Sequence, residues 1–196
     1  MSNTRIGVLG GTFDPIHVGH LVIASEVHAA LGLDRVVLVP TNEQPFKPEG
    51  AAASARQRLQ MCRLAVEGDD RLAVSDVDVA RGGVTFTVDT LTDLAEQFPG
   101  AELTFIAGAD ALARLDEWRD YERLRTLARF VGVARPGWEN EPHAQVERVV
   151  ATPQIGVSST DVRRRVAAGE PVRYLVPDRV ATFIAQHGLY LGGTNA

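Results

Sequence analysis

Short apolar runs alternate with amphipathic segments along almost the whole 196-residue chain. The apolar runs are unbroken and rich in β-branched residues, which is typical of strands that are buried on both faces. Runs of this kind separated by helices predict an α/β fold, namely a Rossmann-like, doubly wound parallel sheet with helices on both faces. We expect strands at Arg5–Leu9, Val36–Val39, Leu72–Val79, Leu103–Ala107 and Phe130–Ala134, and a weaker one at Val149–Thr152.

Residues that start and stop helices mark the intervening segments. Ser54 precedes Gln57 with the spacing of a capping box, and glycines such as Gly188 commonly end helices. The expected helices run from about His17 to Gly32, from Ser54, from Thr87 to Pro99, over 110–115 and 118–128, from Ser158 to Gly169, and from Pro177 to Gly188. No repeat or linker interrupts them, so we expect a single domain over residues 1–196 with its core at about 5–191.

The chain is acidic, with a formal net charge of −5. Broad binding to nucleic acid or to membranes draws on a surplus of Lys and Arg, so neither is expected as a partner and any phosphate site must be local. The sequence contains no signal segment and no stretch of membrane-spanning length, and its only cysteine, Cys62, excludes an internal disulfide. We therefore expect a cytoplasmic protein, and the sequence leaves the choice between monomer and homo-oligomer open.

The segment from Gly10 to His20 joins the first strand to the first helix and carries the strongest functional signal. Gly10 and Gly11 let the backbone turn sharply and approach a ligand, and the N–H groups at a helix start favour an anion. His17 and His20 are three residues apart and therefore lie on one face of the helix. The pattern indicates a phosphate site, in which Gly19 leaves room for the phosphates.

A zinc pair and two satisfied surface histidines are the alternative interpretations of His17 and His20. Zinc would need a third and a fourth ligand. The remaining histidines, His28, His143 and His187, are scattered along the sequence, with no cysteine cluster near them. Metal ligation is therefore the weaker hypothesis, and no protein metal site is predicted.

A second helix start carries three consecutive hydroxyl residues, Ser158-Ser159-Thr160. Arg163 lies one turn further along the same face, where hydroxyls, N–H groups and a guanidinium can all bind phosphate oxygens. A plain helix cap explains only one of the hydroxyls. We expect Ser158, Ser159 and Arg163 to contact phosphate, whereas Thr160 and Arg165 fit either interpretation equally well.

Other candidates follow the later strands. Gly108 and Asp110 come after the strand at 103–107, at the sheet edge where open α/β folds bind ligands, and Asp110 fits either a ligand contact or a helix cap. Trp118 offers an indole face for a flat ring, with core packing as the alternative. Lys47 is the only lysine in the chain, and a charge near the transferring phosphate and a solvated loop lysine are equally compatible with it.

These motifs resemble those of the nucleotidylyltransferase superfamily. His17-Val18-Gly19-His20 matches its (H/T)xGH motif, and Ser158 to Arg163 matches its SSTxxR motif. The whole segment from Gly10 to His20 is similar to the opening pattern of bacterial nicotinate mononucleotide adenylyltransferases. The similarity continues through Arg165, 174–177 and 188–190, and thus runs from residue 6 to about residue 191.

The resemblance implies a reaction and a set of residues. The phosphate of nicotinate mononucleotide would attack the α-phosphorus of ATP directly, releasing pyrophosphate and giving nicotinate adenine dinucleotide for NAD biosynthesis. His17, His20 and Arg163 would be catalytic, and Mg²⁺ would accompany ATP, held by phosphate oxygens and water. Further ATP contacts are expected at Gly10, Gly11, Thr12, Phe13, Gly19, Gly108, Asp110, Arg135, Ser158 and Ser159, and mononucleotide contacts at Lys47, Thr85, Phe86, Thr87 and Trp118.

The chain departs from the family pattern at two aromatic positions. Phe86 replaces a usual tyrosine, which keeps a stacking ring and removes a hydroxyl, and Phe46 replaces a usual histidine. The rival functions are a phosphopantetheine adenylyltransferase and a catalytically silent nucleotide-binding regulator. Trp118 and the segment 85–87 disfavour the first rival, and the retained histidines disfavour the second. The preference between nicotinate and nicotinamide mononucleotide stays open.

Overall fold

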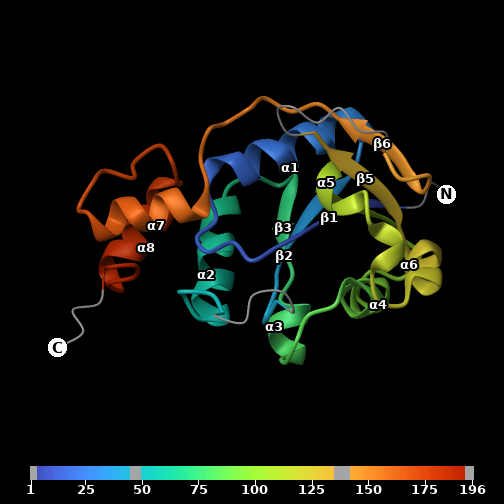
Figure 1. The fold of residues 1–196 in the computed structure, drawn as a ribbon, viewed down its shortest axis with the longest axis horizontal. Coiled ribbons are helices and arrows are strands. Elements are labelled where there is room, and N and C mark those ends of the chain that lie inside the picture. Colours follow the sequence, from blue (N-terminus) through green and yellow to red (C-terminus); the bar gives the residue numbers. More distant parts are fainter. Residues whose placement is uncertain (1–3, 45–49, 135–141, 193–196) are drawn as a thin grey trace.

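The structure, a computed structural model, describes residues 4–44, 50–134 and 142–192 (Figure 1). Its centre is a six-stranded sheet of order β3-β2-β1-β4-β5-β6, in which every neighbouring pair is parallel. This confirms the predicted α/β class. The strands are β1 (Arg5–Gly11), β2 (Arg35–Pro40), β3 (Leu72–Val74), β4 (Glu102–Gly108), β5 (Arg129–Val133) and β6 (Val146–Val150).

The helices alternate with the strands as the sequence pattern predicts. Ser54 caps α2 with the expected reciprocal contacts to Gln57, and Gly32 ends α1 with a left-handed backbone (φ 59°). The helices are α1 (Val18–Leu31), α2 (Ala55–Val66), α3 (Val77–Arg81), α4 (Thr87–Gln97), α5 (Ala109–Leu112), the 3₁₀ turn η1 (Leu115–Glu117), α6 (Tyr121–Leu127), α7 (Ser159–Ala167) and α8 (Asp178–Gln186). Pro177 is the cap of α8 rather than part of its first turn.

The predicted strand over Leu72–Val79 is wrong beyond Val74, because the chain turns there into the short helix α3. Asp78 on this helix is buried, and its carboxylate accepts hydrogen bonds from the Thr90 hydroxyl and the Arg81 guanidinium. The bond from Thr90 joins α3 to the first turn of α4, whereas Arg81 is a partner within α3 itself. A carboxylate with local and tertiary partners therefore overrides the strand preference of the surrounding valines.

The helix predicted over 118–128 begins three residues late, at Tyr121. Trp118 has an extended backbone at the end of η1, and Asp120 has a left-handed backbone (φ 56°). A non-glycine residue in that region breaks helical continuity. The predicted helix over 110–115 likewise divides into α5 and the separate turn η1.

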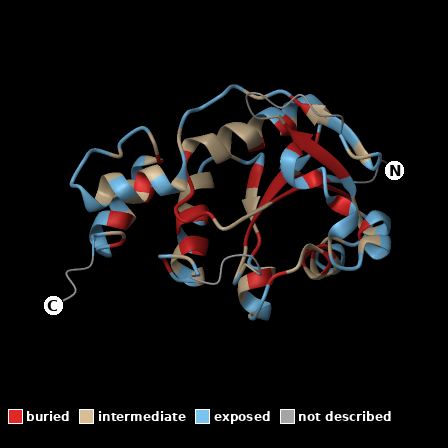
Figure 2. Cartoon of the chain, in the orientation of Figure 1, coloured by how far each residue is buried: buried red, intermediate tan, exposed pale blue. Residues whose placement is uncertain are grey.

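Two apolar layers hold the sheet, and Figure 2 shows the buried residues concentrated along the central strands. One layer packs α1 and α2 against the face that carries Val36 and Leu38. The other packs α4, α5 and α6 against the face that carries Val37 and Val39. Successive residues of β2 therefore point into opposite apolar layers, so the strand is buried on both faces. This agrees with its unbroken apolar sequence.

The position of β1 determines where a ligand can bind. The connection from β1 leads to β2 on one side, whereas the next neighbour on the other side is β4, so the strand order reverses at β1. Open α/β sheets bind ligands at the carboxyl ends of strands at such a point. In Figure 1 the segment from β6 to α7 runs over α1, and α8 packs against α2. Within the described residues no helix is long and apolar enough to cross a membrane.

Candidate active site

The two histidines of the first motif stack on one another at the start of α1. Their ring centroids are 3.7 Å apart, and the Phe13 ring meets His20 edge-on at 4.9 Å. The His17 N–H donates to Nδ1 of His20 at 3.2 Å, which places the proton of a neutral His20 on Nε2. The prediction that both imidazoles share one face of the helix is confirmed.

Burial keeps both imidazoles neutral. It lowers the pKa of His17 to about 4, and burial together with the neighbouring His17 lowers the pKa of His20 to about 3. Nδ1 of His17 is buried without a hydrogen-bond partner among the described residues. A buried ring nitrogen of this kind is costly in a free protein and is a recurrent feature of functional sites.

The structure adds two details to the predicted phosphate site. The N–H groups at the helix start are partly used, since Val18 donates to the Leu175 carbonyl at 2.9 Å and His20 donates to the His17 carbonyl at 3.0 Å. A side chain at Gly19 would lie 3.1 Å from the His17 ring and 3.3 Å from Val157. Gly19 therefore makes room for the imidazole and for the segment before α7, and the room that it was expected to leave for phosphates stays a prediction.

The second motif contacts the first directly. The Ser159 hydroxyl donates to the Pro15 carbonyl at 2.9 Å. Nη1 of Arg163 donates to the Asp14 carbonyl at 2.7 Å and lies 3.9 Å from the Asp14 carboxylate. The predicted pairing of the two motifs is thus present in the structure, and it is made by two side chains of α7 on the backbone of the β1–α1 loop.

The other residues of the second motif serve the helix itself. Ser158 caps α7 by accepting from the Asp161 N–H at 3.1 Å, and the Thr160 hydroxyl accepts from Nη2 of Arg163 at 3.2 Å. Arg164 and Arg165 both pair with Asp161 and with Glu170. Only Arg163 of the three consecutive arginines turns toward the first motif.

Asp14 is a residue of this site that sequence reasoning did not single out. Its carboxylate is 5% exposed and accepts from the N–H groups of Ala52 and Ala53, at 2.7 and 3.0 Å, and from the Tyr190 hydroxyl at 2.7 Å. Asp14 thus holds the β1–α1 loop to the start of α2 and to the C-terminal segment. Its place inside the Gly10 to His20 motif was the only available signal, because its partners are remote in sequence.

Arg58 on α2 is the second residue that the sequence did not reveal. It is 1% exposed, and its guanidinium donates to three backbone carbonyls, those of Thr12, Asn42 and Ala53. Nothing in its local sequence separates it from the other arginines of the chain. A charge buried this deeply needs a hydrogen-bond partner for each donor edge, and three converging loops supply them.

Trp118 packs against an aromatic ring of the neighbouring strand β4. The Trp118 indole lies edge-to-face on Phe105 of β4, with centroids 5.9 Å apart. A side chain at Gly10 would contact the same Phe105 ring at 3.5 Å. Trp118 is only partly buried against that apolar layer. Part of the indole is therefore covered by core residues, and the rest of its surface is accessible to a ligand.

The segment 85–87 packs against the loop that follows β2. The Thr85 hydroxyl accepts from the Asn42 N–H at 3.0 Å, and the Asn42 side chain donates to the Gly83 carbonyl at 2.9 Å. Phe86 caps α4, and the Arg119 guanidinium lies over its ring at 4.4 Å. Thr87 is the first residue of α4. Thr85 therefore has a structural partner, and Phe86 stacks on a cation that neighbours Trp118.

The remaining candidates divide into two groups. Gly108 is both the last residue of β4 and the cap of α5, so the alternative that Asp110 is the cap is wrong, and Asp110 lies in the first turn of α5 with its side chain exposed. Lys47, Phe46 and Arg135 lie outside the described residues.

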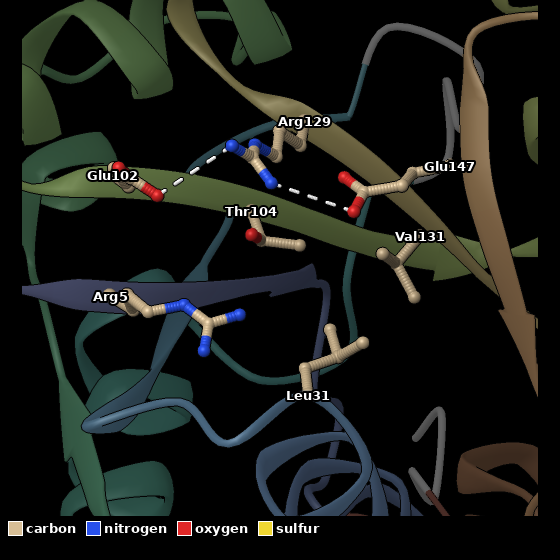
Figure 3. Close-up of a pocket in the computed structure, with 7 residues that line it drawn as sticks. All are labelled: Arg5, Leu31, Glu102, Thr104, Arg129, Val131 and Glu147. Carbon is tan, nitrogen blue, oxygen red and sulfur yellow. Dashed lines mark ion pairs between the residues drawn. The ribbon is translucent and has the colours of Figure 1, made fainter.

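A small pocket at the opposite edge of the sheet does not coincide with these motifs (Figure 3). Arg129 spans it, 3.8 Å from Glu102 and 3.5 Å from Glu147, so the charges on its rim offset one another. Its lining comes from the amino ends of the strands and from the end of α1: Arg5, Leu31, Glu102, Thr104, Arg129, Val131 and Glu147. The candidate active site lies at the carboxyl ends instead.

The lowered pKa values predict an acid-sensitive fold. Below pH 6.5 the unfolded chain protonates histidines that the native chain keeps neutral, so stability is full above that pH and is lost as the pH falls toward 4. Each histidine contributes up to about 1.4 kcal/mol per pH unit to this loss. Urea unfolding at several pH values between 6.5 and 4 measures the slope of the free energy of unfolding against pH.

His20→Gln is expected to reduce the slope of stability against pH, and His28→Gln is the matched control. His28 lies in the last turn of the same helix. Equal slopes in the native chain and in His20→Gln would contradict the assignment of a buried neutral His20.

Removal of the Tyr190 hydroxyl is predicted to weaken the attachment of the C-terminal segment. Tyr190→Phe leaves the Asp14 carboxylate one donor short and should lower the free energy of unfolding by about 1–3 kcal/mol. Tyr174, which is 77% exposed, provides the control, since Tyr174→Phe should change stability by less than about 0.5 kcal/mol. Chemical denaturation measures the free energy of unfolding of both variants. Equal losses in the two variants would refute the role given to Tyr190.

Comparison with known proteins identifies the family of this chain. The model of the family described as cytidylyltransferase-like matches residues 8–165. A probable nicotinate-nucleotide adenylyltransferase of Leifsonia xyli subsp. xyli is 51% identical over 193 residues, which cover 96% of this chain and 95% of that protein. Another, of Paenarthrobacter aurescens, is 50% identical over 189 residues, with 96% and 92% covered.

A solved structure has the same fold. The nicotinic acid mononucleotide adenylyltransferase of Plasmodium falciparum, complexed with NaAD, superposes with a TM-score of 0.77 at 16% identity and covers 96% of this chain and 98% of its own. The resemblance drawn from the sequence motifs is confirmed. The chain belongs to the cytidylyltransferase-like family and, within it, to the nicotinate-nucleotide adenylyltransferases.

Proposed function

We propose that this chain transfers the adenylyl group of ATP to nicotinate mononucleotide, giving nicotinate adenine dinucleotide and pyrophosphate in NAD biosynthesis. The observation that carries the proposal is the convergence of α7 on the first motif. Ser159 and Arg163 bond to the backbone at Pro15 and Asp14, beside the stacked pair of His17 and His20. A guanidinium, hydroxyls and imidazole donors gathered at a helix start form a site suited to a triphosphate.

The proposed mechanism needs alignment and charge stabilisation only. The phosphate oxygen of the mononucleotide attacks the α-phosphorus of ATP in line, the bond to the bridging oxygen breaks, and that oxygen leaves with pyrophosphate. Nε2–H of His20, together with Arg163, would donate to the phosphate oxygens on which charge develops. Positioned donors of this kind account for much of the rate acceleration in phosphoryl and nucleotidyl transfer.

The proposed acceptor site is formed by Trp118, Phe86 and Arg119. The exposed part of the Trp118 ring can stack on the pyridine ring, and Arg119, held over Phe86, brings a positive charge close to it. The nicotinate carboxylate is the group that such a charge would favour over a neutral amide. Lys47 and Thr87 remain sequence-based candidates for the acceptor phosphate, as Arg135 does for the adenosine.

Mg²⁺ is expected to arrive with ATP. Among the described residues no group of three or more His, Cys, Asp or Glu side chains could hold a metal ion. Mg²⁺ at nucleotides is usually coordinated by phosphate oxygens and water. Mg²⁺ would neutralise charge on the triphosphate when bound. The cytoplasmic location stays a prediction from the sequence.

Pyrophosphate release tests the proposal. The chain is incubated with ATP and Mg²⁺ and with one acceptor at a time: nicotinate mononucleotide, nicotinamide mononucleotide or phosphopantetheine. Release with nicotinate mononucleotide, and formation of the dinucleotide, is the expected result. Release with phosphopantetheine alone would indicate a related transferase, and release with none would indicate a regulator that binds nucleotide without turnover.

His20→Ala is predicted to lower kcat far more than it weakens binding of the mononucleotide. Loss of one donor to a developing charge typically costs about 10²–10³ in turnover. His28→Ala, in the last turn of the same helix, is the control and should retain activity. Steady-state kinetics provide kcat, calorimetry provides the mononucleotide affinity, and a comparable loss in both quantities would contradict the triphosphate role.

A further inference from the structure

Arg58 joins two loops: the loop after β1, here the ATP loop, which leads to His17 and His20, and the loop after β2, here the acceptor loop, which supports the segment before Phe86. Nη1 donates to the Thr12 carbonyl at 2.6 Å, in the loop after β1. Nη2 donates to the Asn42 carbonyl at 2.8 Å, in the loop after β2. Nε donates to the Ala53 carbonyl at 3.2 Å, just before α2. One rigid, planar group therefore fixes three chain segments relative to one another.

Each of the two loops leads on to a half of the proposed site. Thr12 precedes Phe13, whose ring packs against His20. Asn42 donates through its N–H to the Thr85 hydroxyl and through its side chain to the Gly83 carbonyl, so it carries the segment before Phe86. The guanidinium of Arg58 is the point at which the hydrogen-bond network of one half meets that of the other.

The ATP loop contains a residue whose backbone conformation is unfavourable, so it depends on hydrogen bonds such as those from Arg58. Phe13 has a left-handed backbone with φ 50°, which is uncommon for a residue with a side chain. Because a trans peptide directs its N–H opposite to its carbonyl, the bond from Arg58 to the Thr12 carbonyl also sets the direction of the Phe13 N–H. Among the described residues this N–H makes no backbone hydrogen bond of the loop or cap kind. Arg58 therefore fixes the orientation of the peptide between Thr12 and Phe13.

We infer that Arg58 is a positioning residue, which holds the ATP loop and the acceptor loop in the alignment that nucleotidyl transfer requires. The inference rests on the proposed function. Arg58 itself is buried beneath the loops at 1% exposure, so it acts through the Thr12 and Asn42 carbonyls and not through contact with substrate. In-line transfer between two bound reactants is sensitive to displacements of about an ångström, which cost about a hundredfold in rate.

Arg58→Lys is the variant that tests this inference. Lysine keeps the charge and most of the volume, but its compact ammonium cannot reach three carbonyls in three directions. We expect each substrate to bind with an affinity near that of the native chain, since each half of the site retains its own contacts. The single-turnover rate with both substrates bound should fall about a hundredfold.

Calorimetric stoichiometry separates misalignment from simple loss of folded protein. Titration with a non-hydrolysable ATP analogue counts the binding-competent molecules, and the rate is expressed per competent site. Leu59→Ala is the matched control, because Leu59 is a buried neighbour on α2 whose truncation destabilises the helix and removes none of the three hydrogen bonds. A rate per competent site that is equally reduced in Leu59→Ala and Arg58→Lys would overturn the inference, as would an unchanged rate in Arg58→Lys.

A second measurement applies if Arg58→Lys does not fold. In the native chain the Arg58 guanidinium hydrogens should be protected from exchange with solvent, both in the free protein and with the ATP analogue and the mononucleotide bound. Rapid exchange in the ternary complex would overturn the inference. Inactivity of the native chain with every acceptor would instead refute the proposed function, and the two failures are therefore distinguishable.

Discussion

The buried carboxylate of Asp14 is the interaction on which the assembled site depends. A carboxylate removed from water is tolerated only when its oxygens are fully hydrogen-bonded, and here two backbone N–H groups and the Tyr190 hydroxyl supply the bonds. Those donors come from the start of α2 and from the end of the chain. The same residue accepts from Arg163 through its backbone carbonyl. Folding of the C-terminal helices is thereby coupled to the formation of the first loop.

This coupling brings two motifs that are far apart in the sequence into one candidate site. Ser159, for example, bonds to Pro15 across a separation of 144 residues. Glycines, histidines and hydroxyls prepare the two helix ends locally. The tertiary bonds from α7 then fix their spacing, and Arg58 fixes the acceptor loop from below. The candidate site is pre-organised by the fold, as the proposed in-line transfer would require.

Sequence reasoning succeeded where structure follows from local chemistry. The strands buried on both faces, the capping box at Ser54 and the helix that begins beside His17 all follow from residue type and spacing. It failed at Asp78 and Asp120. The burial of Asp78 depends on Thr90, twelve residues away, and the positive φ of Asp120 is not encoded by the residue type alone.

The candidate site shows the same division. His17, His20, Ser159 and Arg163 were found because each stands at a recognisable helix start. The roles of Asp14, Arg58 and Tyr190 could not be read, because their partners lie between 5 and 176 residues away and only the fold brings them together. The structure adds a packing role for Gly19, which makes room for the His17 ring, and its predicted contact with phosphates stays a prediction.

The central claim is that the neutral pair of His17 and His20 is the surface that meets the triphosphate. Nitrogen-15 spectra of the histidine rings, recorded as ATP and Mg²⁺ are added without acceptor, test it most directly. We predict that the ring signals of His17 and His20 shift and that the pKa values of these two residues rise from about 4 and about 3. The ring signals of His28, His143 and His187 should keep their positions. ATP binding that leaves the His17 and His20 signals unchanged would contradict it.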